Sequence, residues 1–336
     1  MEWIDEADGV FRGGGVKGIA LAGALEGFAQ DESKPVRRWV NVAGASAGAI
    51  IACYLALGHT AAEMDAVLRG MNFARLADFP RGSKLLGAAN LLVNHGLARG
   101  DEFERWFDQV LEGATFERVR KPADGDPDRD WRLKLIAVDV TRRELLVLPD
   151  DLTSYRPPGR AGLIDPDGFK VARAARMSMS IPYFFEPVEL DHPQTGRSVI
   201  VDGGTLSNFP VWLFDVDPRV AGRPPARPTF GFTLTGGRVF GRGLKAASVL
   251  LPWPLRLGLD IVNTATQAWD KRFMSHSTRV RTLAVDADDV GTTDFDLSPD
   301  RQELLISNGR RAAHDFLRAF RLEDYTNTFH ARPSGA

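Results

Sequence analysis

The sequence lacks the features that mark several classes of protein. Cys53 is the only cysteine among 336 residues, which excludes an intrachain disulfide and a cysteine-based zinc site. The formal net charge is only −2, so the chain has no bulk attraction to nucleic acid. No apolar run is long enough to span a bilayer, and the acidic start, MEWIDEADG, lacks the pattern of a signal peptide. We therefore expect a cytoplasmic protein without a nucleic-acid partner, which leaves peripheral contact with a membrane open.

Apolar runs typical of strands alternate along the chain with longer runs of helical periodicity. This alternation predicts an α/β fold with a central, mostly parallel sheet flanked by helices. No linker-like composition interrupts it, so we expect one domain over residues 1–336, with a core of about 9–321 and a C-terminal tail over 322–336. The predicted strands are Gly9–Phe11, Trp39–Ala43, Leu133–Val138, Leu145–Leu148, Val199–Val201, Thr229–Leu234 and Val280–Val285. The predicted helices are Val16–Ala29, Ala47–Leu57, Ala61–Arg69, Phe103–Leu111, Phe169–Ala175, Leu255–Phe273 and Pro299–Phe320.

The most specific single motif is G-x-S-x-G, formed by Gly44, Ser46 and Gly48 between a predicted strand and a predicted helix. A nucleophile elbow needs small residues two positions before and after the serine, because the strand and the helix approach each other closely there. Ser46 is therefore a candidate nucleophile at the N-terminus of a helix. The alternative is a serine that only caps the helix in a turn of small residues.

A nucleophilic serine needs a base, and two residues are candidates for it. Asp202 ends a predicted strand and precedes Gly203 and Gly204, so a neighbouring loop can approach its carboxyl group closely. An aspartate is a weak base at its usual pKa of ~3.9, but burial raises that value. His276 is the second candidate, because it follows Asp202 in the Ser–Asp–His order of α/β-hydrolases. A plain turn role for Asp202 is also open.

The glycines after the first predicted strand raise a question of their own. Gly13, Gly15 and Gly18 fit G-x-G-x-x-G, so a dinucleotide-binding turn is one interpretation. That motif requires an acidic residue at the end of the second strand, where this chain has Gly44-Ala45-Ser46. The turns that follow neighbouring parallel strands lie at one edge of the sheet, so the amides of this loop would lie beside the serine. They could then bind an oxyanion, and we expect no bound nucleotide.

Together, GGGVKG, GASAG and DGG, in this order and without a histidine motif, resemble the patatin-like phospholipases. ARMSMSIPYFFEPV, over Ala175–Val188, is similar to the serine and proline block of that family, and the resemblance extends over about residues 10–320. It implies a three-layer patatin-like fold, and a lipid acyl hydrolase that cleaves glycerolipids or phospholipids through an acyl-enzyme, without cofactor or metal. It assigns the nucleophile to Ser46, its dyad partner to Asp202, the oxyanion loop to Gly13, Gly14 and Gly15, and supporting positions to Lys17, Gly18, Gly44, Gly48, Gly203 and Gly204.

Three further expectations complete the sequence-based picture. A catalytically silent lipid-binding protein of the same fold is the main alternative function. The segment Val249–Trp269 combines Trp and Leu with two prolines, and is interpreted either as an interfacial helix or as a buried one. Finally, Asp101 and Glu104 are spaced as a capping box, which predicts that Asp101 caps the helix that follows it.

Overall fold

The structure is a computed structural model, and the residues described in it are 4–31, 36–70, 78, 90–91, 94–121, 130–215, 227–236, 253, 257–258, 261, 264, 276–287, 290–292, 294 and 297–330. The strands are β1 (Glu6–Phe11), β2 (Arg38–Ala45), β3 (Gly96–Ala98), β4 (Leu133–Asp139), β5 (Glu144–Leu148), β6 (Tyr183–Phe185), β7 (Val188–His192), β8 (Gly196–Asp202), β9 (Thr229–Thr235) and β10 (Thr282–Asp286). The helices are α1 (Ile19–Gln30), α2 (Ala47–Ala56), α3 (Ala61–Gly70), α6 (Asp101–Val110), α7 (Val171–Ser178), α11 (His276–Val280), α12 (Pro299–Ala319) and α13 (Leu322–His330). Short 3₁₀ helices include η1 (Gly15–Gly18), η6 (Gly203–Thr205) and η7 (Val211–Phe214).

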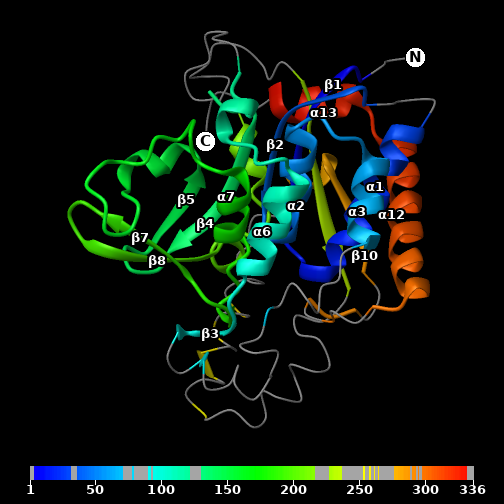
Figure 1. The fold of residues 1–336 in the computed structure, drawn as a ribbon. Coiled ribbons are helices and arrows are strands. Elements are labelled where there is room, and N and C mark those ends of the chain that lie inside the picture. The colour runs from blue at the N-terminus through cyan, green and yellow to red at the C-terminus, as the bar shows by residue number, and fades with distance from the viewer. Residues whose placement is uncertain are drawn as a thin grey trace.

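Eight strands form one central sheet in the order β10-β9-β1-β2-β4-β8-β7, with β5 paired to β4 (Figure 1). The five strands from β10 to β4 are parallel to one another. The remaining pairings, of β4 with β5 and β8 and of β7 with β8, are antiparallel. The expected α/β fold with a mostly parallel sheet flanked by helices is therefore confirmed.

The register on β4 brings the ends of two strands together. β5 pairs with Leu135 to Asp139 along one edge of β4, and this range overlaps the residues that pair with β2 and with β8, so β2 and β8 must share the other edge. β2 runs parallel to β4 and ends with Ala45 opposite Ile136. β8 runs in the opposite direction and ends with Asp202 opposite Ala137, the next residue of β4. The residue that follows β2 and the last residue of β8 are therefore neighbours in space.

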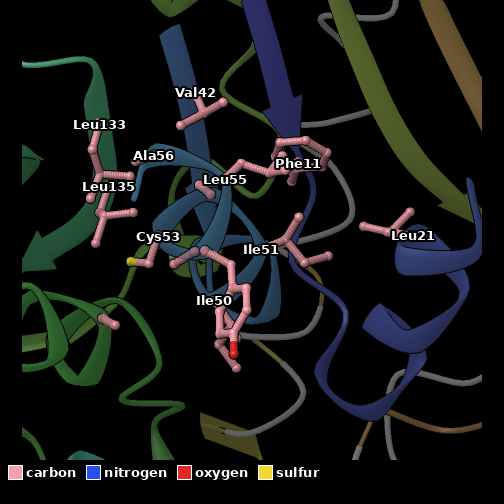
Figure 2. Packing of buried hydrophobic residues seen from close by; sticks show 14 of the residues in the cluster. Phe11, Leu21, Val42, Ile50, Ile51, Cys53, Leu55, Ala56, Leu133 and Leu135 are labelled. Carbon is pink, nitrogen blue, oxygen red and sulfur yellow. The ribbon is translucent and has the colours of Figure 1, made fainter. Parts of the chain in front are cut away.

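The main core lies between this sheet and the helices α1, α2 and α7, and Figure 2 shows α2 at its centre. All ten residues of α2 are buried, which fits a helix that is apolar on every side. Alternate residues of the strands divide between the two faces of the sheet. Phe11 and Val42 face the main core, whereas Val10 and Ala43 pack against a smaller cluster around η7 on the opposite face. On the helical side, α12 lies along α1 (Figure 1).

Several elements differ from the sequence-based expectations. The strands β3, β6 and β7 were not predicted, and the short β3 and β6 form a separate two-stranded sheet. The capping box at Asp101 is wrong, because Gly100 is the N-cap of α6 and its φ of 81° is positive. The carboxylate of Asp78 accepts hydrogen bonds from the first amides instead, with Gly100 N at 2.6 Å and Asp101 N at 3.1 Å. A cap supplied by a distant residue leaves no local signal in the sequence.

Two expectations concern the later part of the chain. The predicted helix Leu255–Phe273 lies largely outside the described residues, although Leu257 and Ile261 are helical. The segment expected as a tail from residue 322 contains α13, whose Tyr325 is buried, with its hydroxyl bonded to Thr229 N at 3.1 Å. Of the helices described, not even α12 with its 21 residues combines the length and hydropathy needed to cross a membrane.

Candidate active site

Ser46 occupies the turn between β2 and α2 in a strained conformation. Its φ of 53° and ψ of −125° lie outside the regions that residues with a side chain ordinarily adopt. The turn is compact because α2 starts close against the sheet. A Cβ atom on Gly44 would lie 2.2 Å from the Gly48 carbonyl oxygen, and a Cβ atom on Gly48 would lie 2.2 Å from the Phe11 carbonyl oxygen. The small residues of G-x-S-x-G are thus required by packing at this turn.

Ser178, the last residue of α7, links the backbone of this turn to β4 through two hydrogen bonds. Ser46 N donates to Ser178 Oγ at 3.0 Å, and Ser178 Oγ donates in turn to the Ile136 carbonyl oxygen of β4 at 2.6 Å. Both serines are buried. Sequence reasoning identified the segment around Ser178 without giving this residue a role, and the only signal was a serine at alternate positions of SMSIP.

Asp202 lies next to Ser46 and is held by its own backbone and by the turn that follows. Its backbone N donates to the Ser180 carbonyl oxygen at 2.9 Å, and its Oδ1 accepts a hydrogen bond from Gly204 N at 2.6 Å. Gly203 passes so close to β4 that a Cβ atom on it would lie 2.2 Å from the Ile136 carbonyl oxygen. Within the described part of the chain, the buried Oδ2 has no hydrogen-bond partner.

The environment of Asp202 makes its carboxylate a far better base than an exposed aspartate. Burial raises the pKa of this group to about 7, although the Ser46 side chain and the Gly204 amide both act to lower the pKa. The Ser46 hydroxyl is therefore near the carboxyl group, yet no hydrogen bond of ordinary length joins it to Oδ2. Asp202 Oδ2 is therefore placed to accept a proton from the neighbouring Ser46 hydroxyl group.

The glycine loop lies against the same turn. A Cβ atom on Gly13 would lie 2.9 Å from Ser46 Cβ, so the loop and the serine are in contact. Gly13 N is already bonded to the Asn208 carbonyl oxygen at 3.0 Å. Gly14 and Gly15 are partly exposed, and no residue in the described ranges accepts a hydrogen bond from either of their amides. Gly15 has a φ of 56°.

Two basic side chains flank this loop. Lys17, in η1, is buried, and its backbone N donates to the Gly14 carbonyl oxygen at 3.3 Å. Burial and, secondly, the charge of Arg12 lower the pKa of Lys17 to about 8, while Asp294 acts in the opposite direction. Arg12 itself donates from Nη1 to the Leu234 carbonyl oxygen at 2.7 Å. Gly18 completes the loop, where its Cα faces α2 and an added Cβ would lie 3.1 Å from Ala47 Cβ.

The structure does not bring His276 to this edge of the sheet. Ser46 follows the last residue of β2 and thus lies at the carboxyl edge of the parallel strands. His276 begins α11, which leads into the first residue of β10, so it lies at the amino edge. A Ser–Asp–His arrangement is therefore disfavoured by the topology, and Asp202 is the acidic residue next to the serine.

The comparison with known proteins agrees with this geometry. The sequence profile of the family described as "Patatin-like phospholipase" matches residues 9–215, which include the glycine loop, Ser46 and Asp202. The chain is 38% identical over 315 residues to the uncharacterized protein YqhO of Bacillus subtilis, covering 93% of this chain and 98% of that one. It is 24% identical over 205 residues to the uncharacterized protein R571 of Acanthamoeba polyphaga mimivirus, covering 61% and 60%.

A solved structure extends the comparison to the fold. The crystal structure of VipD from Legionella pneumophila is similar with a TM-score of 0.52 and 17% identity, covering 94% of this chain and 67% of that one. At this identity the likeness concerns the fold alone. The profile match spans more than half of the chain, and the match to YqhO spans nearly all of it. The chain belongs to the patatin-like phospholipase family.

Proposed function

We propose that this protein hydrolyses acyl esters of glycerolipids or phospholipids with Ser46 as nucleophile and Asp202 as base. Membership of the family supports a lipid hydrolase. The observation that carries the finer assignment is Asp202 Oδ2 beside the strained Ser46. This oxygen has no hydrogen-bond partner among the described residues, and burial raises the pKa of its carboxyl group to about 7. A base with a pKa near the working pH is both deprotonated and able to take up a proton.

The first half of the reaction forms an acyl-enzyme. Ser46 Oγ attacks the ester carbonyl carbon while Asp202 Oδ2 takes the hydroxyl proton, and the carbonyl electron pair moves onto the oxygen. The amides of Gly14 and Gly15 bind this oxyanion, and the nearby Lys17 adds positive charge at the loop. When the tetrahedral intermediate collapses, the carbon–oxygen bond to the alcohol breaks and Asp202 gives its proton to the leaving alcohol.

The second half releases the fatty acid with the same groups. Water attacks the acyl carbonyl carbon while Asp202 accepts one of its protons, and the same amides hold the second oxyanion. Collapse breaks the bond to Ser46 Oγ, which regains a proton from Asp202. Neither half of the proposed reaction uses a cofactor. In each half, the carboxyl group of Asp202 takes up one proton and then returns it.

We further propose that this cytoplasmic enzyme meets its substrate at a membrane surface. Trp253, Leu257 and Ile261 follow one another at helical spacing and are 71%, 41% and 59% exposed. An exposed apolar stripe containing a tryptophan is typical of a helix that lies in a membrane interface. Gly258, next to Leu257, contacts Tyr183, where a Cβ atom would lie 2.4 Å from the Tyr183 hydroxyl oxygen, and so places these residues beside β6.

Activity assays on defined lipids test the chemistry. Wild type should release fatty acid from one or more glycerolipids in a panel of phospholipids, lysophospholipids and neutral esters. Ser46→Ala and Asp202→Asn should each reduce turnover to background, whereas Ser198→Ala removes another buried serine hydroxyl and should retain it. If wild type binds the lipids without turnover, the protein is a silent lipid-binding member of the family and the proposal is wrong.

Co-sedimentation with phosphatidylcholine vesicles, with and without phosphatidylglycerol, tests the membrane contact. Leu257→Ala should weaken the binding because an apolar side chain leaves the interface. Leu304 on α12 has nearly the same exposure, 44% against 41%, and Leu304→Ala is therefore the matched control. Equal binding of the two variants, or no binding by wild type to either vesicle, would contradict the proposed surface.

A further inference from the structure

We infer that Asn208 is a positioning residue that holds the glycine loop in place for the oxyanion. The inference depends on the proposed function, because it concerns how the loop is held during ester hydrolysis. Asn208 lies six residues beyond Asp202, between η6 and η7, and its side chain is buried. It differs from the proposed catalytic residues because it acts on the substrate only through the glycine loop and the turn after Asp202.

Asn208 forms hydrogen bonds with both the backbone N–H and the carbonyl group of Gly13. Gly13 N donates to the Asn208 carbonyl oxygen at 3.0 Å, and Asn208 Nδ2 donates to the Gly13 carbonyl oxygen at 3.3 Å. The fit is tight, because a Cβ atom on Gly13 would lie 2.1 Å from Asn208 Oδ1. A pair of hydrogen bonds and a close steric contact thus define where the loop starts.

The same side chain reaches the turn that carries the proposed base. A Cβ atom on Gly204 would lie 2.8 Å from Asn208 Oδ1 and 3.0 Å from Asp202 Oδ1. Asn208 therefore lies between the glycine loop and the turn after Asp202, and it contacts both. The two parts of the site come from β1 and β8, which are not neighbours in the sheet, so they need such a link to keep a fixed separation.

These hydrogen bonds give the three glycines different roles. Because Gly13 N is bonded to Asn208, it serves as the anchor, and the amides of Gly14 and Gly15 are the ones left for the oxyanion. Loss of the Nδ2 bond would let the loop shift relative to Ser46. A shift of the donors weakens the transition state more than the bound substrate, since the oxyanion exists only after attack.

Kinetics of Asn208→Ala test the inference. We expect kcat to fall by about tenfold or more. This loss is smaller than the ~10²–10³-fold loss in rate that removal of a whole oxyanion donor causes. KM should change much less. A long-chain alkyl trifluoromethyl ketone, which forms an oxyanion on Ser46, should lose about the same factor in affinity. The alkyl methyl ketone of the same chain length, which forms no stable adduct and carries no charge, should inhibit the variant as it inhibits wild type.

A matched control separates positioning from stability. Asn41 is likewise buried, and its Nδ2 donates to Asp8 Oδ1 at 2.9 Å on a part of β2 away from the turn. Asn41→Ala should lower the melting temperature and leave kcat and the inhibitor ratio unchanged. If Asn208→Ala behaves like Asn41→Ala in both readouts, Asn208 is only structural and the inference is overturned.

A double variant keeps the test decisive if one substitution distorts the site. Gly13→Ala places a methyl group 2.1 Å from Asn208 Oδ1 and 2.9 Å from Ser46 Cβ, and Asn208→Ala removes the first and closer contact, so the two losses in kcat should partly overlap. We expect the loss in kcat of the double variant to be about tenfold smaller than the product of the two single losses. A loss equal to that product would show that Asn208 and Gly13 do not act together. Should Ser46→Ala retain activity, the proposed function fails whatever Asn208 does.

Discussion

Replacing Asp202 by asparagine should stabilise the folded protein at neutral pH while it removes the proposed base. The cause is the burial of the carboxyl group, which raises its pKa from 3.8 to about 7. A group that binds its proton more tightly in the folded state lowers the free energy of unfolding as pH rises between the two pKa values. Asparagine has the same shape and no proton to release, so the variant does not lose this free energy.

The expected magnitude follows from the shift of about three pKa units, each worth about 1.4 kcal/mol. Above pH 7 the ionised Asp202 costs wild type about 4 kcal/mol of unfolding free energy, an upper figure for a buried group. The cost falls as pH drops through the window from about 7 to 4 and is nearly absent at the lower end. The amide NH₂ introduced by the variant adds an offset that does not depend on pH.

Urea unfolding of wild type and Asp202→Asn at several pH values from 4.5 to about 8.5 measures the difference. We expect the unfolding free energy of the variant minus that of wild type to rise steadily up to about pH 7 and to stay constant above it. A difference that stays flat over the whole range would show that Asp202 titrates at an ordinary pKa, and the argument for a base tuned by burial would fail.

Three further predictions follow from the same geometry. The kcat/KM of ester hydrolysis should rise with pH through an apparent pKa of about 7, because Asp202 acts as a carboxylate, and a profile flat from pH 5 to 9 would contradict this. Gly15→Ala should lower kcat by about 10²–10³-fold, because φ is positive and an added Cβ would lie 2.0 Å from the Thr292 carbonyl oxygen. Gly159 also has a positive φ, but an added Cβ would meet no described atom within 4 Å, so Gly159→Ala should not change kcat. Ser178→Ala should lower the free energy of unfolding by about 1–3 kcal/mol in urea titrations and reduce kcat, because a buried amide at the elbow loses its partner.

Local patterns along the chain were enough to predict most of the sheet. The strands that became β1, β2, β4, β5, β8 and β9 are apolar runs bounded by turn residues, and the structure places them within a few residues of the expected bounds. β6 was missed because its three residues are too few for a periodic signal. The strand expected from Val280 begins at Thr282, since the preceding residues complete α11.

The candidate site could be predicted where its residues adjoin one another in sequence, and where the glycine loop and Ser46 follow neighbouring parallel strands. Ser46 and its glycines form such a group, as do Asp202 and the two glycines that follow it. That the two groups meet depends on the antiparallel register of β8 on β4, which no local pattern specifies. Asn208 was missed for the same reason, because its contact with Gly13 spans 195 residues.

Mass spectrometry of the protein after reaction with a fluorophosphonate ester identifies the nucleophilic residue itself. We expect one covalent adduct, on the peptide that contains Ser46, which forms in wild type and does not form in Ser46→Ala. We also expect much slower labelling of Asp202→Asn, because no carboxylate takes the hydroxyl proton. An adduct on another serine, or undiminished labelling of Ser46→Ala, would contradict the proposed mechanism.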